Sequence, residues 1–250
     1  MEILILSLIQ GLTEFLPVSS SSHLIIISEY INFDNQSLSI DVSLHIGSFL
    51  AVIFYFYEDI FNFFKNKILF FKVFISSIPV IIVGFFLIKT NLIEKLRSIE
   101  IIGWTTLIFG LILFISDKFK TEKNLDHNFN LKSALVIGLF QVLSLIPGVS
   151  RSGITISAGR FLGFNRFDSS KISFLLSIPT LAAVSIFGIN NIINEENLNL
   201  SKLNIYSMVM SFIFSYFTIK LFLNYIKKST LNIFVFYRVI LGLTLIIFSH

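Results

Sequence analysis

The chain has 250 residues, of which 54% are hydrophobic and only 14% are charged, and its mean hydropathy is +0.84. This composition excludes an ordinary soluble domain with a wet surface, so most of the protein surface must face membrane lipid. There is no cysteine, which excludes disulfides and thiolate chemistry. The net charge is +4, but the lysines lie in short loops between apolar runs, so we interpret them as a sign of membrane topology and predict no nucleic-acid partner.

The first apolar stretch, residues 3–31, is interrupted by Pro17 and by the serines of positions 19–22. Lipid cannot satisfy the backbone groups that such a break exposes, so breaks occur inside protein or beside a watery cavity. We therefore predict a broken or re-entrant helix pair here. The N-terminus lacks a basic region and a small-residue cleavage site, so we predict no signal peptide.

Six uninterrupted apolar runs are long enough to cross a bilayer as tilted helices. They cover residues 40–57, 68–88, 99–116, 172–189, 205–226 and 231–249. A second interrupted stretch, residues 133–163, contains Pro147-Gly148 and the polar positions 150–152, and we predict a second broken helix pair. The predicted fold is thus all-α and polytopic, a single membrane domain with about six spans and two broken pairs.

The two broken stretches resemble each other in sequence. Residues 10–25 align without gaps on residues 141–156, and six of the sixteen positions are identical. We interpret this as an inverted internal repeat, with halves at roughly 1–117 and 131–250 that are joined by a cytoplasmic loop at 117–132. Paired broken segments in two halves indicate a binding site near the membrane midplane.

Loop charges predict the topology. Lysines are concentrated in loops 58–67 and 117–132 and at Lys227 and Lys228, and such loops are typical of the cytoplasmic side. Loop 190–204 has Glu195 and Glu196 against a single lysine, and loop 89–98 has mixed charges, so we place both on the opposite side.

Glu14 lies in an otherwise apolar segment, four residues after Gln10, so a helix would put both side chains on one face. A carboxylate inside a membrane is costly, which makes it a functional candidate. The alternatives are a structural pair with Gln10 or a neighbouring helix, a general base, and a ligand of Mg²⁺ or Ca²⁺, which prefer oxygen.

His23 follows the four serines and lies on the far side of the Pro17 break from Glu14. A lone histidine near a membrane boundary is often structural. Beside Glu14 and a run of hydroxyls it has the make-up of an acid/base group, and one of the serines becomes a candidate nucleophile.

Arg151 is the strongest indication of a phosphate site, because its planar guanidinium matches phosphate oxygens and is costly inside a membrane. Around it, Ser150, Ser152, Gly153 and Thr155 supply hydroxyls and backbone N–H groups at a predicted helix start, which suits a phosphate cradle. The alternative, an arginine that only pairs with Glu14, does not account for these neighbours.

Two further polar pairs each have two alternative roles. Asp41 and His45 lie four residues apart near the start of a span and could support the site or lie at the membrane interface. Tyr237-Arg238 in the last span could neutralise a phosphate, or the arginine could extend to the interface.

The segment from Gln10 to His23 resembles the (Glu/Gln)-x-x-x-Glu and Pro-Val-Ser-Ser-x-Gly-His signature of the undecaprenyl-diphosphate phosphatases, also called bacitracin-resistance proteins. Residues 147–155 look like their Pro-Gly-x-Ser-Arg-Ser-Gly-x-Thr signature. Segments 44–48, 173–179 and 236–238 also resemble the family, so the likeness covers nearly the whole chain. Ser22 is a departure, since the family has glycine there.

The resemblance implies an enzyme that hydrolyses undecaprenyl diphosphate to the monophosphate and phosphate, with a divalent cation, Mg²⁺ or Ca²⁺. It further implies a homodimer in the bacterial inner membrane, surrounded by lipid, with a site open to the periplasmic face. We assign catalytic roles to Glu14, Ser20, His23 and Arg151, phosphate binding to Ser19, Ser150, Arg151, Ser152 and Thr155, and the cation to Gln10 and Glu14.

The competing hypothesis is a secondary transporter, because broken helices in repeated halves are typical of transporters too. It would use Glu14 and Arg151 as ion sites, but it does not need a serine cluster beside a histidine. A channel or scaffold would not need the polar residues at all. Unrelated lipid phosphatases with a Ser-Arg-x5-His motif are a poorer match, because Ser157 stands where that motif has histidine.

Overall fold

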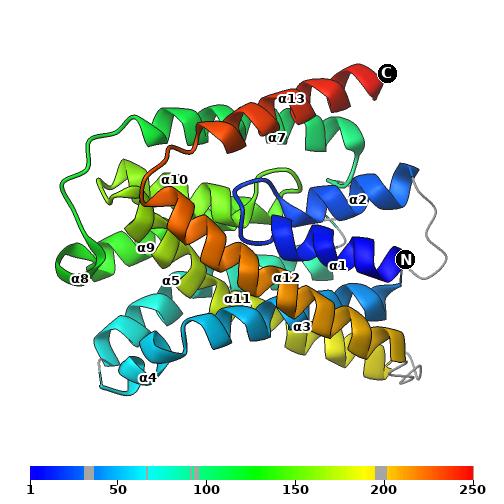
Figure 1. Ribbon diagram of the computed structural model, residues 1–250, viewed down its shortest axis with the longest axis horizontal. Coiled ribbons are helices and arrows are strands. Elements are labelled where there is room, and N and C mark those ends of the chain that lie inside the picture. Colours follow the sequence, from blue (N-terminus) through cyan, green and yellow to red (C-terminus); the bar gives the residue numbers. More distant parts are fainter. Residues whose placement is uncertain (31–36, 66, 91, 93–95, 195–201, 250) are drawn as a thin grey trace.

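The chain folds into a bundle of helices (Figure 1), and the described part contains no β-strand, which confirms the predicted fold class. The computed structural model describes residues 1–30, 37–65, 67–90, 92, 96–194 and 202–249. Most of the charged residues on which we based the outer placement of loops 89–98 and 190–204 lie outside these ranges, so that placement stays a prediction.

The predicted repeat divides the helices into two sets. The first half contains α1 (Glu2–Thr13), α2 (Ser20–Tyr30), α3 (Leu38–Tyr55), the short α4 (Tyr57–Lys65), α5 (Lys67–Lys89) and α7 (Ile99–Asp117). After the one-turn α8 (Leu125–Asn128), the second half contains α9 (Leu131–Val142), a 3₁₀ turn (Leu143–Leu145), α10 (Arg151–Phe161), α11 (Arg166–Asn194), α12 (Lys202–Ile226) and α13 (Asn232–Phe248).

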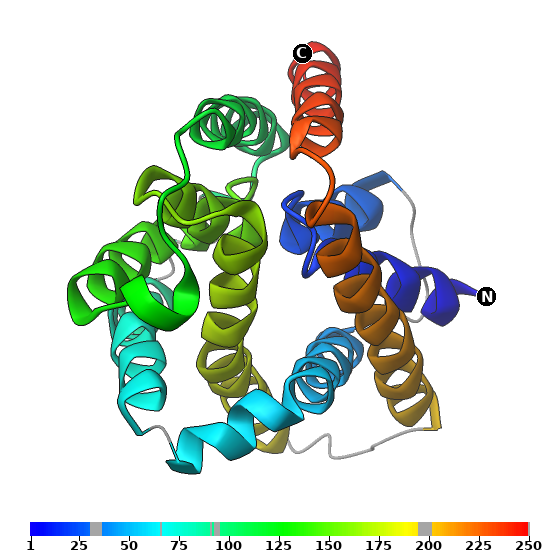
Figure 2. The ribbon, with the colours of Figure 1, turned by 60° about the vertical axis from the view of Figure 1, so that its left-hand side comes forward.

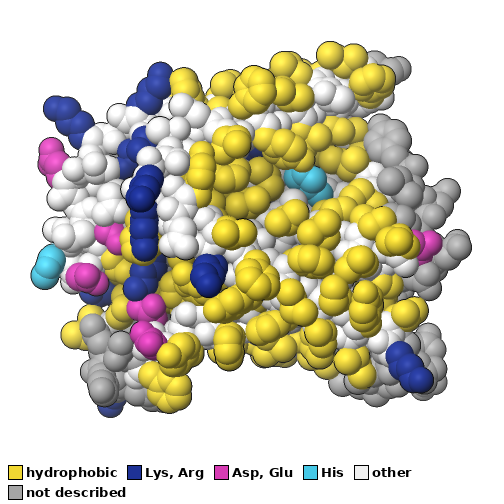
Figure 3. All heavy atoms as spheres, in the orientation of Figure 1, with side chains coloured by type: hydrophobic (Ala, Val, Ile, Leu, Met, Phe, Trp, Pro, Cys, Tyr) yellow, Lys and Arg dark blue, Asp and Glu magenta, His cyan; other side chains and the backbone are white. Residues whose placement is uncertain are grey.

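Five of these helices, α3, α5, α7, α11 and α12, are long and apolar enough to cross a membrane. They coincide with five of the six predicted spans, and the sixth corresponds to α13, whose 17 residues are at the lower limit for a crossing. Hydrophobic side chains cover most of the face in Figure 3, while Lys and Arg gather mainly at the end where α8 lies. The protein is a multi-pass membrane protein.

Each predicted broken stretch is a pair of short helices joined by an irregular turn. α1 and α2 form one hairpin and α9 and α10 form the other, and the two hairpins enter the bundle from opposite ends, so that their turns lie near its middle (Figure 1). Within each helix of a hairpin the backbone groups bond to one another, and only the turns and the helix ends depend on neighbouring protein.

Close contacts between helices recur in the two halves. The Ser7 hydroxyl in α1 lies 3.4 Å from the carbonyl oxygen of Ser207 in α12, and Gly138 in α9 lies directly against the carbonyl of Ser76 in α5. Ser7 is as far in sequence from Gly138, and Ser76 from Ser207, as Gln10 is from Gln141. Helix packing in membranes depends on such small residues, and the contacts fit the repeat seen in the sequence.

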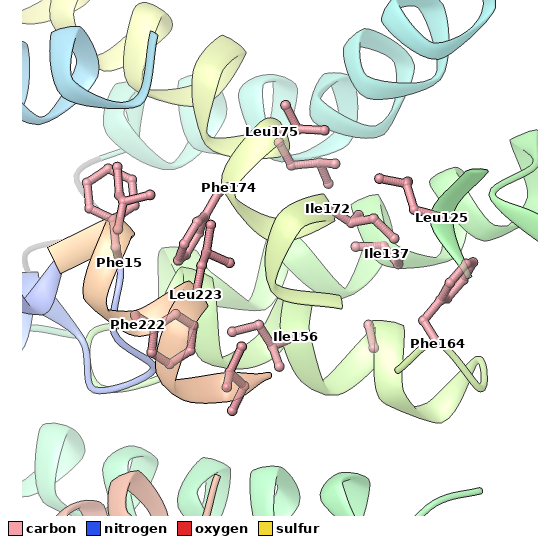
Figure 4. Packing of buried hydrophobic residues seen from close by; sticks show 14 of the residues in the cluster. Phe15, Leu125, Ile137, Ile156, Phe164, Ile172, Phe174, Leu175, Phe222 and Leu223 are labelled. Atoms are coloured by element: carbon pink, nitrogen blue, oxygen red, sulfur yellow. The ribbon is translucent and has the colours of Figure 1, made fainter. Parts of the chain in front are cut away.

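Aromatic packing anchors the first turn in the bundle. Phe15, which follows Glu14, packs edge-on against Phe174 of α11 with ring centroids 5.3 Å apart, and Phe174 packs against Phe222 of α12 (Figure 4). All three rings are buried. At the opposite edge of the molecule α7 and α13 run side by side (Figure 2). The turns are therefore held between α11 and α12 on one side and the α7–α13 pair on the other.

Candidate active site

The two turns share an unusual backbone feature. Ser19 and Ser150 occupy equivalent positions in the repeat, each directly precedes a helix, and each has a positive φ, 79° and 71°. They are the only non-glycine residues with positive φ in the described part of the chain. Such conformations cost free energy and concentrate at functional sites. Here they direct the N-termini of α2 and α10, with their free N–H groups, towards one pocket.

Glu14 joins the two turns. One of its oxygens, Oε1, accepts a hydrogen bond from Arg151 Nη2 at 2.6 Å, and Oε2 accepts one from the Ser20 hydroxyl at 2.7 Å. The carboxylate is 8% exposed. An arginine from one half thus neutralises a nearly buried acid from the other half, and the same acid holds the first hydroxyl of α2.

Gln10 extends this network to α3. Its Nε2 lies 3.1 Å from Glu14 Oε2 and 3.0 Å from His45 Nδ1, while its Oε1 is buried without a hydrogen-bond partner. His45 therefore supports Glu14 through Gln10 and also lines the pocket, in agreement with the alternative in which it supports the site. Asp41, the other member of the pair, does not line the pocket.

A pocket of about 250 Å³ lies between the two turns. Of the predicted residues, those that line it are Glu14, Ser19, Ser20, Ser150 and Arg151. Unpredicted polar neighbours complete the wall, namely Thr13, Ser21, Gln141, Ser144 and Thr180. Gln141 is the repeat equivalent of Gln10, and its side-chain amide is buried without a partner. The alignment of the two halves could have identified it.

Four predicted site residues do not line the pocket. The hydroxyl of Ser152 donates to the carbonyl of Leu16 at 2.7 Å, and that of Thr155 donates to Ser173 Oγ at 2.7 Å. Gln10 lies behind Glu14. Ser152 thus holds one turn to the other, and Thr155 holds α10 to α11. Successive positions of a helix face different neighbours, so these hydroxyls point away from the pocket that Arg151 lines.

His23 is the fourth, although the sequence predicts a catalytic role for it together with Glu14, Ser20 and Arg151. Its Nδ1 lies 2.6 Å from the carbonyl oxygen of Ser19, and its Nε2 is hydrogen-bonded to the hydroxyl of Tyr237 in α13. Both ring nitrogens are therefore occupied away from the pocket. His23 contacts the site through Ser19, which itself lines the pocket.

Arg238 of α13 is completely buried, which excludes an arginine that extends to the membrane interface. It donates to the carbonyls of Pro17 at 3.2 Å, Gly148 at 2.8 Å and Val149 at 3.0 Å. Pro17 and Gly148 are equivalent positions in the repeat. One guanidinium thus holds the same carbonyl of both turns and fixes their separation. The sequence indicates Arg238 as a candidate for neutralising a phosphate, but it does not predict that Arg238 binds the carbonyls of the two turns.

Comparison with known proteins gives a consistent result over the whole chain. The family described as Bacitracin resistance protein BacA matches residues 3–244. A protein of Pelagibacter ubique (strain HTCC1062) named undecaprenyl-diphosphatase is 51% identical, over 100% of this chain and 97% of the relative. Proteins of the same name from Jannaschia sp. (strain CCS1) and Hahella chejuensis are 39% and 40% identical, over at least 97% of either chain.

Proposed function

Because the chain belongs to the bacitracin resistance protein BacA family, we infer that it is an undecaprenyl-diphosphate phosphatase. It hydrolyses undecaprenyl diphosphate to undecaprenyl phosphate and inorganic phosphate, which recycles the lipid carrier of cell-wall synthesis and confers bacitracin resistance. The relatives reported above are named for this reaction and not for transport.

The observation that carries this function is the position of Glu14 between Ser20 and Arg151. A diphosphate needs cationic donors for its oxygens and an oxygen nucleophile near phosphorus. The pocket offers the guanidinium of Arg151, the N-termini of two helices and the Ser20 hydroxyl, all within reach of one carboxylate. A transporter needs an anion site, but not a hydroxyl bonded to a carboxylate.

We propose the following roles for the residues of the pocket. Arg151 and the N–H groups of the Ser19 and Ser150 turns bind the oxygens of the terminal phosphate and stabilise the charge that develops there. The oxygen of Ser20, or of a water in its place, attacks the terminal phosphorus, while Glu14 Oε2 accepts its proton. The bond from phosphorus to the bridging oxygen breaks, and its electron pair leaves with the lipid phosphate.

In the Ser20 route, water then hydrolyses the phosphoserine to release phosphate and restore the hydroxyl. His23 supports either route indirectly, because it holds the Ser19 carbonyl and so the turn before α2.

The site suits a divalent cation only together with the substrate. Among the described residues there is no group of three or more His, Cys, Asp or Glu side chains that could hold a metal by itself. The unpartnered Oε1 of Gln10 and the carboxylate of Glu14 are oxygen ligands, and Mg²⁺ is commonly bound by one or two carboxylates plus phosphate oxygens. Mg²⁺ or Ca²⁺ held there would offset the charge of the diphosphate.

For this cation we expect activity to disappear in a chelator and to return when either Mg²⁺ or Ca²⁺ is added back to the same sample. Phosphate release measured before and after chelation tests this. Full turnover in metal-free buffer would contradict it, and Glu14 would then act as a base and as the partner of Arg151 alone.

We further propose that the protein lies in the bacterial inner membrane with the pocket open to the periplasmic side. In support, the pocket-lining residues His45, Val80 and Val184 lie nearer to the ends of α3, α5 and α11 that are remote from the lysine-rich loops. Positively charged loops mark the cytoplasmic side. A membrane-impermeant reagent that blocks activity from the outside only would support this orientation, and one that acts only from the inside would reverse it.

A homodimer is proposed from the family resemblance alone. Light scattering of the protein in detergent, corrected for bound detergent, would distinguish a dimer from a monomer.

The proposed activity itself is tested with purified protein in detergent and a short-chain prenyl diphosphate. We expect phosphate release by the wild type, and a loss of at least about 100-fold when the Glu14 carboxylate is replaced in Glu14→Gln, on the scale of losing one positioned catalytic group. If folded wild-type protein releases no phosphate under conditions where a purified relative does, the phosphatase function is wrong.

A further inference from the structure

A second cavity, of about 520 Å³, lies at the lysine-rich end of the molecule, where the ends of α7, α10 and α12 meet the start of α11. It shares no lining residue with the candidate active site. Its charged lining consists of Asp117, Lys120, Arg160, Arg166 and Lys227, which is four cations against one carboxylate. In Figure 3 the Lys and Arg side chains gather mainly at this end.

The single carboxylate of the cavity is already neutralised. Asp117 accepts two hydrogen bonds from Arg166, 2.6 Å from Nε and 3.1 Å from Nη2, and a third from the backbone N–H of Leu231. Arg160 shares the same carboxylate in a longer ion pair of 3.6 Å, so Asp117 is the one lining carboxylate for both arginines and none is left for Lys120 and Lys227. The cavity therefore carries a net positive charge.

One of these cations is both buried and incompletely hydrogen-bonded. Arg160 is 2% exposed, and its two terminal nitrogens donate to the carbonyls of Asp117, Phe119 and Phe164. Its Nε is buried with no hydrogen-bond partner, and its nearest carboxylate oxygen is Oδ1 of Asp117 in an ion pair at 3.6 Å. A buried donor without an acceptor is costly, and a bound oxyanion would remove that cost.

The lysines of the cavity differ in how they are held. The ammonium of Lys227 lies over the ring of Phe167, which also lines the cavity, with its nitrogen 4.9 Å from the ring centroid. That contact keeps one cation at the cavity wall. Lys120 is exposed and lies in the loop after α7, so it is free to close over a ligand.

We propose that this cavity binds a phosphate-bearing anion at the cytoplasmic surface, either the headgroup of an anionic phospholipid or free phosphate. Guanidinium and ammonium groups around a cavity of this size match the charge and the oxygens of a phosphate. Its place at the ends of several spans is where headgroups of the lysine-facing leaflet lie, and juxtamembrane basic residues attract anionic lipids. This site is separate from the catalytic pocket, and the proposal stands or falls independently of the proposed reaction.

The chain offers a closely matched pair of variants. The double variant Lys120→Ala/Lys227→Ala removes one exposed lysine and one lysine that lies over a phenyl ring. Its control, Lys118→Ala/Lys228→Ala, also removes an exposed lysine and one over a ring, Lys118 over Phe114, but neither lines the cavity. Both variants lose the same charge from neighbouring positions, so a general electrostatic effect would change both equally.

The lipid arm measures phosphatidylglycerol retained by each protein in native mass spectrometry, with phosphatidylcholine as the neutral comparison. Each basic side chain near an anionic headgroup contributes a factor of about five in affinity, so we expect roughly 30-fold weaker binding in Lys120→Ala/Lys227→Ala and little change in the control. The phosphate arm measures inorganic phosphate by titration calorimetry, where the cavity adds a second site that only the first variant loses.

Loss in the lipid arm identifies a headgroup site, and loss in the phosphate arm identifies a site for free phosphate. Equal binding by the two double variants in both arms, or a larger loss in the control, would overturn the proposal. Phosphate release from a prenyl diphosphate in neutral detergent reports folding, and we expect both variants to match the wild type, since neither changes the catalytic pocket.

Discussion

At the scale of residues, Glu14 determines how the candidate active site can be probed. It is a nearly buried acid that accepts hydrogen bonds from Arg151 and Ser20 at 2.6 and 2.7 Å. Removing one partner of a buried ion pair leaves an uncompensated charge and costs about 3–5 kcal/mol. Glu14→Gln therefore has to be checked for folding by its melting temperature, and substitutions that keep the charge of Arg151, or leave the pair in place and change Ser20, are easier to interpret.

Arg151→Lys keeps one positive charge beside Glu14 but loses the planar fork. Bidentate sites rarely tolerate this exchange, and the loss of one preorganised donor typically lowers turnover by about 100-fold or more. We expect a decrease of that size in kcat, measured as phosphate release from a prenyl diphosphate, with a normal melting temperature. Near-normal turnover would mean that Arg151 is only the structural partner of Glu14.

Ser20→Ala distinguishes two nucleophiles. If the Ser20 oxygen attacks phosphorus, its removal should abolish nearly all turnover; if a water attacks, the loss should be modest, because Glu14 can still accept a proton. We expect the first result, since the hydroxyl already donates to Glu14 in the pocket. Ser22→Ala is the matched control, because Ser22 is buried, does not line the pocket and has its hydroxyl on Ser19.

At the scale of elements, the site depends on two turns that hold the starts of α2 and α10 together. Ser19 and Ser150 have positive φ, and Arg238 donates to carbonyls in both turns. Gly148 has φ of +93°, and a Cβ there would lie only 1.9 Å from Thr105 Oγ1, so only glycine fits beside α7. Side chains from α7 and α13 thus set the geometry of a pocket that they do not line.

Arg238→Met tests whether Arg238 positions the two turns of the site without contacting the substrate. Methionine fills similar space but donates nothing, so the carbonyls of Pro17, Gly148 and Val149 lose their shared donor. Misplacement of a catalytic group by about 1 Å can cost on the order of 100-fold, and we expect kcat to fall by about that factor. Arg238→Lys should recover part of the loss, because one ammonium can still reach some of the carbonyls. Wild-type kcat in Arg238→Met would refute the positioning role.

At the scale of the whole molecule, close contacts join helices of the first half to helices of the second half. α1 of the first half packs against α12 of the second, and α9 of the second packs against α5 of the first. The pocket lies between hairpins that enter from opposite ends (Figure 1), so neither half alone contains it. The stability of the whole bundle and the geometry of the site are therefore linked through these contacts.

Gly138→Ala should destabilise the molecule as a whole. A Cβ at this position would lie 2.1 Å from the carbonyl oxygen of Ser76, so α9 and α5 would have to separate. Overpacking of this kind costs about 1–3 kcal/mol. We expect a lower melting temperature in detergent for Gly138→Ala but not for Gly84→Ala, where the nearest atom is a leucine methyl at 3.4 Å. Equal melting of the two variants would contradict this role of the α5–α9 contact.

The sequence alone predicts the membrane class, the five spans that the described part of the structure contains and the two breaks, and it names the pairing of Glu14 with Arg151 as an alternative. Each of these depends on local chemistry: apolar length sets a span, and Pro17 and Pro147 interrupt otherwise apolar runs. Charged groups inside lipid must find each other, and Glu14 and Arg151 do so at 2.6 Å. The repeat was visible because both turns use the same residue types.

Which of the polar residues face the pocket depends on how the helices pack in three dimensions. His23, Ser152 and Thr155 form hydrogen bonds to neighbouring backbone or side chains, whereas Gln141, which only its alignment with Gln10 indicates, lines the pocket. Arg238 donates a hydrogen bond to the carbonyl of Pro17, which lies 221 positions before it in the chain. Side-chain direction depends on the rotation of each helix against its neighbours, which is fixed by close contacts between distant segments and leaves no local pattern in the sequence.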